Sequence, residues 1–311
     1  MLFFRSKTLF AKLQPTALTD SVPIATDAVQ VFDLEIDPYE GDTVEETVER
    51  EQFGNYLQFN TSPTTTMRFK VYLKGTGSAG DAAFFGPLLR GCGFAETLNA
   101  STDATYDLVS TGQEMLTLKY VLSGNQVHAA LDCRGTVRLE FTRGGLPYLQ
   151  FEFTGAYVEP VTSALAADIS AWEAITTLPV NRANTVFTLD STTPCLEQLV
   201  ADVANEVVSR DLPNCYSTSI VDRSPNGNCN FEAPTLATKD WFDVLESHNG
   251  VTTVAGSIVH GSTAGNIIEV QMPRVQLAGI SFENSDGILV YNTNARFIPV
   301  AGNDEIQIIV R

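Results

Sequence analysis

The feature that most constrains the fold of this chain is a two-residue alternation of apolar and polar side chains, which recurs along much of the sequence. Successive side chains of a β-strand point to opposite faces of a sheet, so this alternation predicts strands with one buried face and one polar face. Phe32, Leu34 and Ile36, for example, alternate with Asp33 and Glu35. Further strands are expected in the first half at residues 67–74, 114–122, 126–132, 136–141 and 149–158, most of them bounded by Gly, Asn or Pro.

Two segments carry the spacing of a helix instead. Residues 81–93 and 238–248 place apolar side chains on one helical face, and a glycine ends or follows each segment. Asp81 is a suitable N-cap for the first of them. We therefore expect two short helices, each packed against a sheet of its own half. Their expected core anchors are Phe84, Leu88, Trp241 and Leu245.

The order of the predicted elements is the same in the two halves of the chain. A first strand, a connection, a second strand, a helix and a final pair of strands follow one another twice, and the first strands are expected at residues 29–36 and 199–208. A repeated order at low sequence identity is typical of a degenerate tandem duplication. The sequence predicts a mainly-β protein with an N-terminal arm at residues 1–28, a first domain at 29–160, a connecting segment at 161–185 and a second domain at 186–311.

The composition is acidic, and this excludes one large class of function. The chain has 37 Asp and Glu against 19 Lys and Arg, with a formal net charge of -18. A groove that binds nucleic acid needs clustered bases to displace counterions, so such a groove is not expected, although DNA moving past the protein is compatible with the charge. The longest irregular segment, residues 37–63, holds seven of the acids and one base, Arg50. Its acids lack the DxDxDG order of a calcium loop, which favours a solvated surface.

No cluster of residues predicts a catalytic, metal or cofactor site. His128, His248 and His260 fall on separate elements without the spacing of a zinc site. Residues 75–80 match the letters GxGxxG, but no parallel βαβ pattern surrounds them, which favours a turn. The five cysteines are widely spaced and are interpreted as reduced thiols. We therefore expect a protein that is not an enzyme; a glycosidase-type pair of carboxylates remains the alternative of that class.

Several stretches resemble the major tail tube proteins of long-tailed bacteriophages. Residues 84–97, FFGPLLRGCGFAET, are similar to the helix and exit of these proteins, in which a GPLLRACG…ET phrase recurs. Gly91 stands where that phrase has Ala. The resemblance extends over nearly the whole chain. The segments similar to the second half of these proteins are residues 205–208, 221–227 and 232–240.

The resemblance implies a β-sandwich or barrel-like tail-tube domain in each half, with one flanking helix. It implies a structural virion protein that is made in the host cytoplasm and assembles as stacked rings around a channel for the genome. Rings of the family hold six domain equivalents, so three chains with two domains each are expected to form one ring. By the same resemblance the partners are other copies of the chain and the tape measure, terminator and distal tail proteins, with DNA passing without specific binding and no cofactor or membrane.

Two groups of acids receive expected places in such a ring. Like charge on a channel wall keeps DNA from adhering, so we expect Asp33, Glu35, Asp202 and Glu206 at the lumen; an outer solvated face is the alternative. The alternative function is that of an exposed virion decoration or host-binding β-sandwich protein. The acidic loop is expected to bridge stacked rings through Asp37, Glu40, Asp42, Glu45, Glu46, Glu49 and Glu51.

Overall fold

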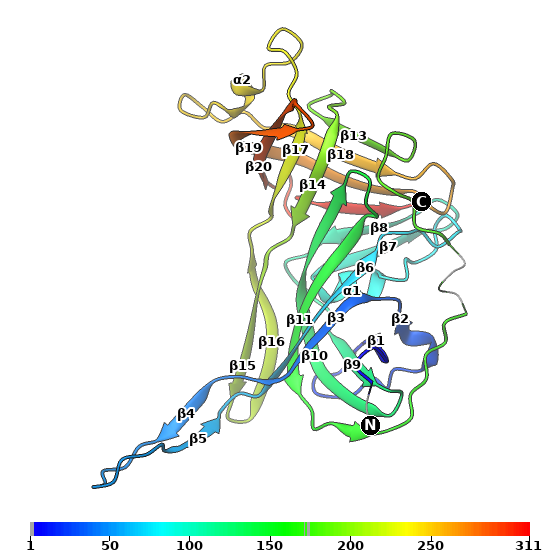
Figure 1. Ribbon diagram of the computed structural model, residues 1–311. Coiled ribbons are helices and arrows are strands. Elements are labelled where there is room, and N and C mark those ends of the chain that lie inside the picture. The colour runs from blue at the N-terminus through cyan, green and yellow to red at the C-terminus, as the bar shows by residue number, and fades with distance from the viewer. Residues whose placement is uncertain (1–2, 171, 173–174) are drawn as a thin grey trace.

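The computed structural model describes residues 3–170, 172 and 175–311. These residues fold mainly into β-strands with two short α-helices, so the predicted mainly-β class is confirmed. Figure 1 shows an elongated body crossed by long strands, with the hairpin of β4 (Thr43–Glu46) and β5 (Leu57–Asn60) projecting far from it. The body is built around two antiparallel groups of strands, which we call sheet 1 and sheet 2.

Sheet 1 contains the strands whose alternation is clearest in the sequence. Its strands pair in the order β3–β6–β11–β10, and at its centre Phe69 lies opposite Phe151. Leu34, Met67 and Phe69 are buried on one face, because every second side chain of a strand turns toward the same side. The bounds are β3 (Phe32–Glu40), β6 (Thr64–Tyr72), β10 (Gln126–Thr142) and β11 (Tyr148–Tyr157).

Sheet 2 has the same construction in the second half of the chain. Its strands pair in the order β14–β17–β20–β19, and Cys229 lies opposite Thr293 near its centre. Cys229, Phe231 and Ala295 are buried on one face. The bounds are β14 (Leu196–Asp202), β17 (Asn226–Glu232), β19 (Ile268–Ser285) and β20 (Ile288–Phe297).

The long strands β10 and β19 each continue into a second layer, so both halves are β-sandwiches. The first part of β10 pairs with β9, which pairs with β1; the first part of β19 pairs with β18, which pairs with β13. Each long strand has a register shift where it passes from one layer to the other, and bulges of this kind bend a strand. The second layers contain β1 (Lys7–Leu13), β2 (Ala28–Val29), β9 (Leu116–Leu122) and β12 (Val161–Thr162), and β13 (Thr185–Leu189), β18 (Val254–His260) and β21 (Gln307–Val310).

Strand pairing joins the two halves at two places among the described residues. β10 of sheet 1 pairs with β14 of sheet 2, so that the two sheets form one continuous surface. In the second layer, β21 pairs with β19 and also with β8 (Asp103–Leu108), which forms a hairpin with β7 (Phe94–Asn99). The large cluster of buried apolar residues therefore includes side chains from both halves.

The helices lie where the sequence predicts them but are shorter. Helix α1 spans Gly86–Gly91, with Phe85 and not the expected Asp81 at its N-cap. Pro87 lies in the first turn, where proline is well tolerated. Helix α2 spans Trp241–Leu245, and Asp240 caps it by accepting from the backbone N–H groups of Phe242 and Asp243. Of the expected anchors, Leu88 and Trp241 are fully buried, and Phe84 and Leu245 are partly buried against the core. The remaining short helix is η1 (Ala25–Asp27).

Two expected strands differ in detail. Phe32 does not share a face with Leu34, because Asp33 adopts a left-handed backbone conformation (φ 49°) at a break in the β3–β6 register. Phe32 instead stacks on Tyr72 of β6 on the opposite face, with ring centroids 4.2 Å apart. The segment expected as one strand at residues 199–208 is divided after Asp202, because Ala204 also has a left-handed conformation (φ 49°).

Candidate functional site

One polar surface with a defined geometry is the face of sheets 1 and 2 that points away from the core. Because β10 pairs with β14, this face runs without a break from β3 to β19, and we call it the polar face. Aligned side chains on neighbouring strands form rows across it, as in Lys70 opposite Gln150 and Asn230 opposite Asn292. Its charged members are Asp33, Glu35, Asp37, Glu40, Arg68, Lys70, Arg138, Glu140, Glu152, Asp202, Glu232, Glu283 and Arg296.

Opposite charges on the sheet 1 part of the polar face neutralise one another. Lys70 Nζ lies 3.0 Å from Asp33 Oδ2, and the Arg68 guanidinium contacts Asp37 and also Glu152, the latter at 3.2 Å. The hydrogen bond to Asp37, followed by that to Glu152, raises the pKa of Arg68. These pairs are 28–62% exposed, so they order the surface but add little to stability.

The sheet 2 part of the polar face is rich in uncharged amides. Asn228 and Asn230 of β17 lie opposite Asn294 and Asn292 of β20. Amide side chains offer both donors and acceptors but carry no charge, so this region is polar without a strong field of either sign. Acids still outnumber bases on the polar face as a whole, which gives it a net negative charge.

The four acids expected at a lumen do not all lie together. Asp33 and Glu35 are on the polar face, beside Lys70 and Arg68 respectively. Asp202 ends β14 on the same face, where its carboxylate accepts from the Ala204 N–H at 2.7 Å. Burial raises the pKa of Asp202. Glu206 lies beyond the turn at Ala204, on β15, opposite Asp222, and is separate from the face because the expected strand is divided.

The hairpin of β15 (Asn205–Leu212) and β16 (Cys215–Arg223) docks on the first half of the chain. The Asn205 side chain donates to the carbonyl oxygens of Cys92 and Gly135 at 2.8 and 2.9 Å. The Arg134 guanidinium donates to the carbonyl oxygens of Thr218 and, at 3.1 Å, Gln113. These contacts bridge residues from both halves and fix the direction in which the hairpin leaves sheet 2.

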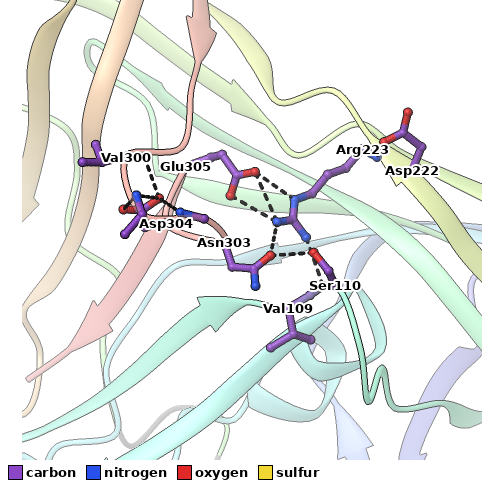
Figure 2. Close-up of polar contacts among 10 residues, drawn as sticks. Val109, Ser110, Asp222, Arg223, Val300, Asn303, Asp304 and Glu305 are labelled. Atoms are coloured by element: carbon purple, nitrogen blue, oxygen red, sulfur yellow. Dashed lines mark hydrogen bonds and ion pairs between the residues drawn. The ribbon is translucent and has the colours of Figure 1, made fainter.

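A charged cluster holds the end of this hairpin (Figure 2). Arg223 contacts Glu305 at 3.2 Å, donates to the Val109 carbonyl at 3.0 Å and reaches the Asn303 side chain at 2.6 Å. The side chains of Arg223 and Glu305 are 14% and 8% exposed. Removing one partner of such a buried pair leaves the other uncompensated, so this cluster ties β16 to the C-terminal segment and the first half.

The corresponding hairpin of the first half, β4–β5, projects from sheet 1 instead of lying on the body (Figure 1). It falls within the segment expected as an irregular acidic loop, and part of that segment is therefore paired strand. Its apolar side chains are as exposed as its acids: Val44, Leu57 and Phe59 are each more than half exposed. We call residues 41–63 the arm, which is distinct from the N-terminal arm expected at residues 1–28. Its exposed acids are Asp42, Glu45, Glu46, Glu49 and Glu51, and Asp37 and Glu40 lie at its base on β3.

Within residues 3–170, 172 and 175–311, no group of three or more His, Cys, Asp or Glu could hold a metal ion. No helix in this range is long and apolar enough to cross a membrane. His260 is buried, with ring nitrogens 2.9 Å from Thr185 Oγ1 and 3.1 Å from the Leu178 carbonyl, and burial lowers its pKa. Burial raises the pKa values of the Cys92, Cys133 and Cys229 thiols, which makes them poor nucleophiles.

Comparison with known proteins adds no assignment to this geometry. No protein-family model matches the chain, and no curated protein sequence matches it.

Proposed function

We propose that this chain polymerises as stacked rings into the hollow tail tube of a long-tailed bacteriophage, through which the genome passes into the host. The observation that carries the proposal is the continuous surface of sheets 1 and 2, built twice in one strand order, with a core on one side and a polar face on the other. A wall of this kind can curve around a channel and keep its apolar residues out of the water.

The polar face is the surface that we assign to the lumen. Its ion pairs and amides, together with an excess of acids, offer duplex DNA no row of bases to bind. Asp33, Glu35 and Asp202 keep the lumen position expected from the sequence in this proposal. DNA then slides along hydrated groups that do not hold its phosphates.

The arm is the part of the chain that we assign to contacts between stacked rings. It exposes apolar side chains on a projecting hairpin, and such surfaces on a soluble protein usually mark an interaction site. Within the virion tail the partners of the assembled tube are further copies of the chain and, at the ends and in the lumen, the terminator, distal tail and tape measure proteins.

Electron microscopy of the purified protein tests the proposal. Long hollow tubes are expected, with rings of three chains and pseudo-sixfold symmetry. A ring of six whole chains would mean that only one half of each chain forms the wall. Discrete oligomers that never lengthen would contradict the tube and favour a decoration or host-binding protein.

A further inference from the structure

The junction between β10 and β14 is a complete example of how the two sheets join edge to edge. Arg138 lies opposite Asp202 on the polar face, and Leu139 lies opposite Ala201 on the core side. Leu139 and Ala201 are 1% and 2% exposed. Edge pairing at this junction therefore closes the core of one sandwich against the core of the next.

Sheets 1 and 2 have the same strand order, so each strand of this junction has an equivalent strand, its counterpart, in the other sheet. β10 is the last strand of sheet 1 as β19 is of sheet 2, and β14 is the first strand of sheet 2 as β3 is of sheet 1. Leu149 of β11 and Tyr291 of β20 are the first buried core-side residues of equivalent strands, and we align them on that basis. Leu139 lies opposite Leu149, and Phe282 lies opposite Tyr291, so this alignment makes Phe282 the counterpart of Leu139.

The same comparison fixes the counterparts on the other edge. Val71 lies opposite Leu149 as Phe231 lies opposite Tyr291, which aligns β6 with β17 and places Met67 at the position of Gly227. Ile36 lies opposite Met67 and Ala201 lies opposite Gly227, so Ile36 is the counterpart of Ala201. The neighbouring residues correspond in the same way. Ser281 precedes Phe282 as Arg138 precedes Leu139, and Asp37 follows Ile36 as Asp202 follows Ala201.

Both counterpart edges lack a strand partner among the described residues. Ser281–Ser285 pair with β20 alone, because the pairing of β19 with β18 and β21 ends before them, and β3 pairs with β6 alone. Phe282 is 63% exposed, whereas its counterpart Leu139 is buried. An unpaired edge of this kind is a template for another strand.

We propose that β19 of one copy pairs antiparallel with β3 of the next copy, with Ser281 opposite Asp37, Phe282 opposite Ile36 and Glu283 opposite Glu35. This pairing, which we call the seam, deepens the proposed function and rests on it for the closure of a ring. Phe282 and Ile36 then take the places of Leu139 and Ala201 and complete the core at the edge.

The ends of the seam follow from groups that interrupt edge pairing. Val203 donates its N–H to the Val137 carbonyl at 3.0 Å beyond the β10–β14 pairing. Its counterpart is Pro38, which has no N–H to donate. At the other end Lys7 Nζ already donates to the Leu34 carbonyl at 2.5 Å. The seam is therefore shorter than the internal junction and is centred on Glu35–Asp37.

Engineered cysteines test this register in assembled protein. The background carries Cys195→Ser and Cys215→Ser, since these two thiols are exposed. Directly opposed residues of an antiparallel pair have Cα atoms about 4.5–5.5 Å apart, within reach of a disulfide, whereas diagonal neighbours lie about 7–8 Å apart, beyond it. Asp37→Cys with Ser281→Cys is the in-register pair, and Glu35→Cys with Ser281→Cys is the diagonal control.

On mild oxidation, at least about ten times more disulfide between chains is expected from the in-register pair than from the diagonal control. Equal or reversed yields in tubes would overturn the seam and leave the tube proposal standing. Discrete oligomers that show the in-register disulfide would support the seam while contradicting the tube. Hydrogen exchange of the unsubstituted chain is the second measurement: Glu35–Asp37 and Ser281–Glu283 should gain protection on assembly, and no gain would overturn the seam even if a cysteine variant fails to fold.

Discussion

Removal of the Phe282 side chain should weaken assembly much more than folding. In the single chain Phe282 is 63% exposed and stacks on Tyr291, with ring centroids 5.7 Å apart. Complete burial of a phenylalanine side chain is worth about 1.5–3 kcal/mol, so burying the part still exposed would contribute roughly 1–2 kcal/mol to each seam. A loss of that size lowers an association constant roughly 5–30-fold.

The critical concentration for tube formation measures this loss. Each chain added to a closed ring contributes one seam, so Phe282→Ala should raise the critical concentration by about the same 5–30-fold, read by sedimentation of polymer from free chain. Leu236→Ala is the matched control, because Leu236 is 60% exposed and lies outside both paired edges. Its critical concentration should change little.

Unfolding of the unassembled chain separates assembly from folding. Loss of the stacking on Tyr291 should lower the free energy of unfolding, measured by urea denaturation, by about 0.5–1.5 kcal/mol. A Phe282→Ala chain that keeps its fold and assembles at the original critical concentration would refute the reasoning, because the exposed ring would then gain nothing from a neighbour.

Three further predictions concern the core, the arm and one carboxylate. Trp241 is 1% exposed and packs on Phe231 with centroids 5.2 Å apart, so Trp241→Ala should lower the free energy of unfolding by about 3–5 kcal/mol; a loss below about 1 kcal/mol would show that the site does not behave as core. Replacing residues 41–55 and their pairing partners on β5 by a two-residue turn should leave a folded chain, checked by circular dichroism, that forms single rings but no tubes, and normal tubes would contradict the role of the arm. Burial raises the pKa of Asp202, so its ionised form disfavours the folded state: stability from this group is complete below the unfolded pKa and is lost as pH rises through the folded value. Asp202→Asn should therefore unfold at higher urea than the original chain at pH 7 and lose that advantage below about pH 4, whereas an equal difference at both pH values would exclude titration of Asp202 as its cause.

Simple alternation was sufficient to find the strands that pair in register. β6 and β11 were predicted within a few residues, since their side chains alternate without interruption. Arg68 and Lys70 alternate with Met67 and Phe69 along one strand, so the sequence also predicts that the two bases lie on the face away from the core. Their ion pairs with β3 and β11 were not predicted, because register between strands depends on contacts distant in sequence.

The strands that escaped prediction lie where local signals were weak or broken. β1 falls in the expected N-terminal arm, and β7 and β8 were assigned no structure, although Ala104, Tyr106 and Leu108 alternate and are buried. Left-handed residues at Asp33 and Ala204 changed the face of Phe32 and separated Glu206 from Asp202. Such conformations are uncommon in residues other than glycine, and neither position is a glycine that would have indicated one.

The domain boundaries stay a prediction, and so does the identity of the chain as a tube protein. The boundary expected at residue 186 lies one residue after the start of β13 at Thr185. Part of the expected connecting segment, residues 171, 173 and 174, lies outside the described residues.

The pairing of β21 with β8 has a mechanical consequence for the proposed ring of three chains. Inside each chain the two sandwiches are tied by β10–β14, by β21–β8 and by the docked β15–β16 hairpin. The β7–β8 hairpin has no equivalent strands between α2 and β18, so this second tie does not recur between chains. The ring would then have three stiff interfaces within chains, alternating with three more flexible interfaces between chains. A tube under load would bend at the interfaces between chains, and it would dissociate there into whole chains.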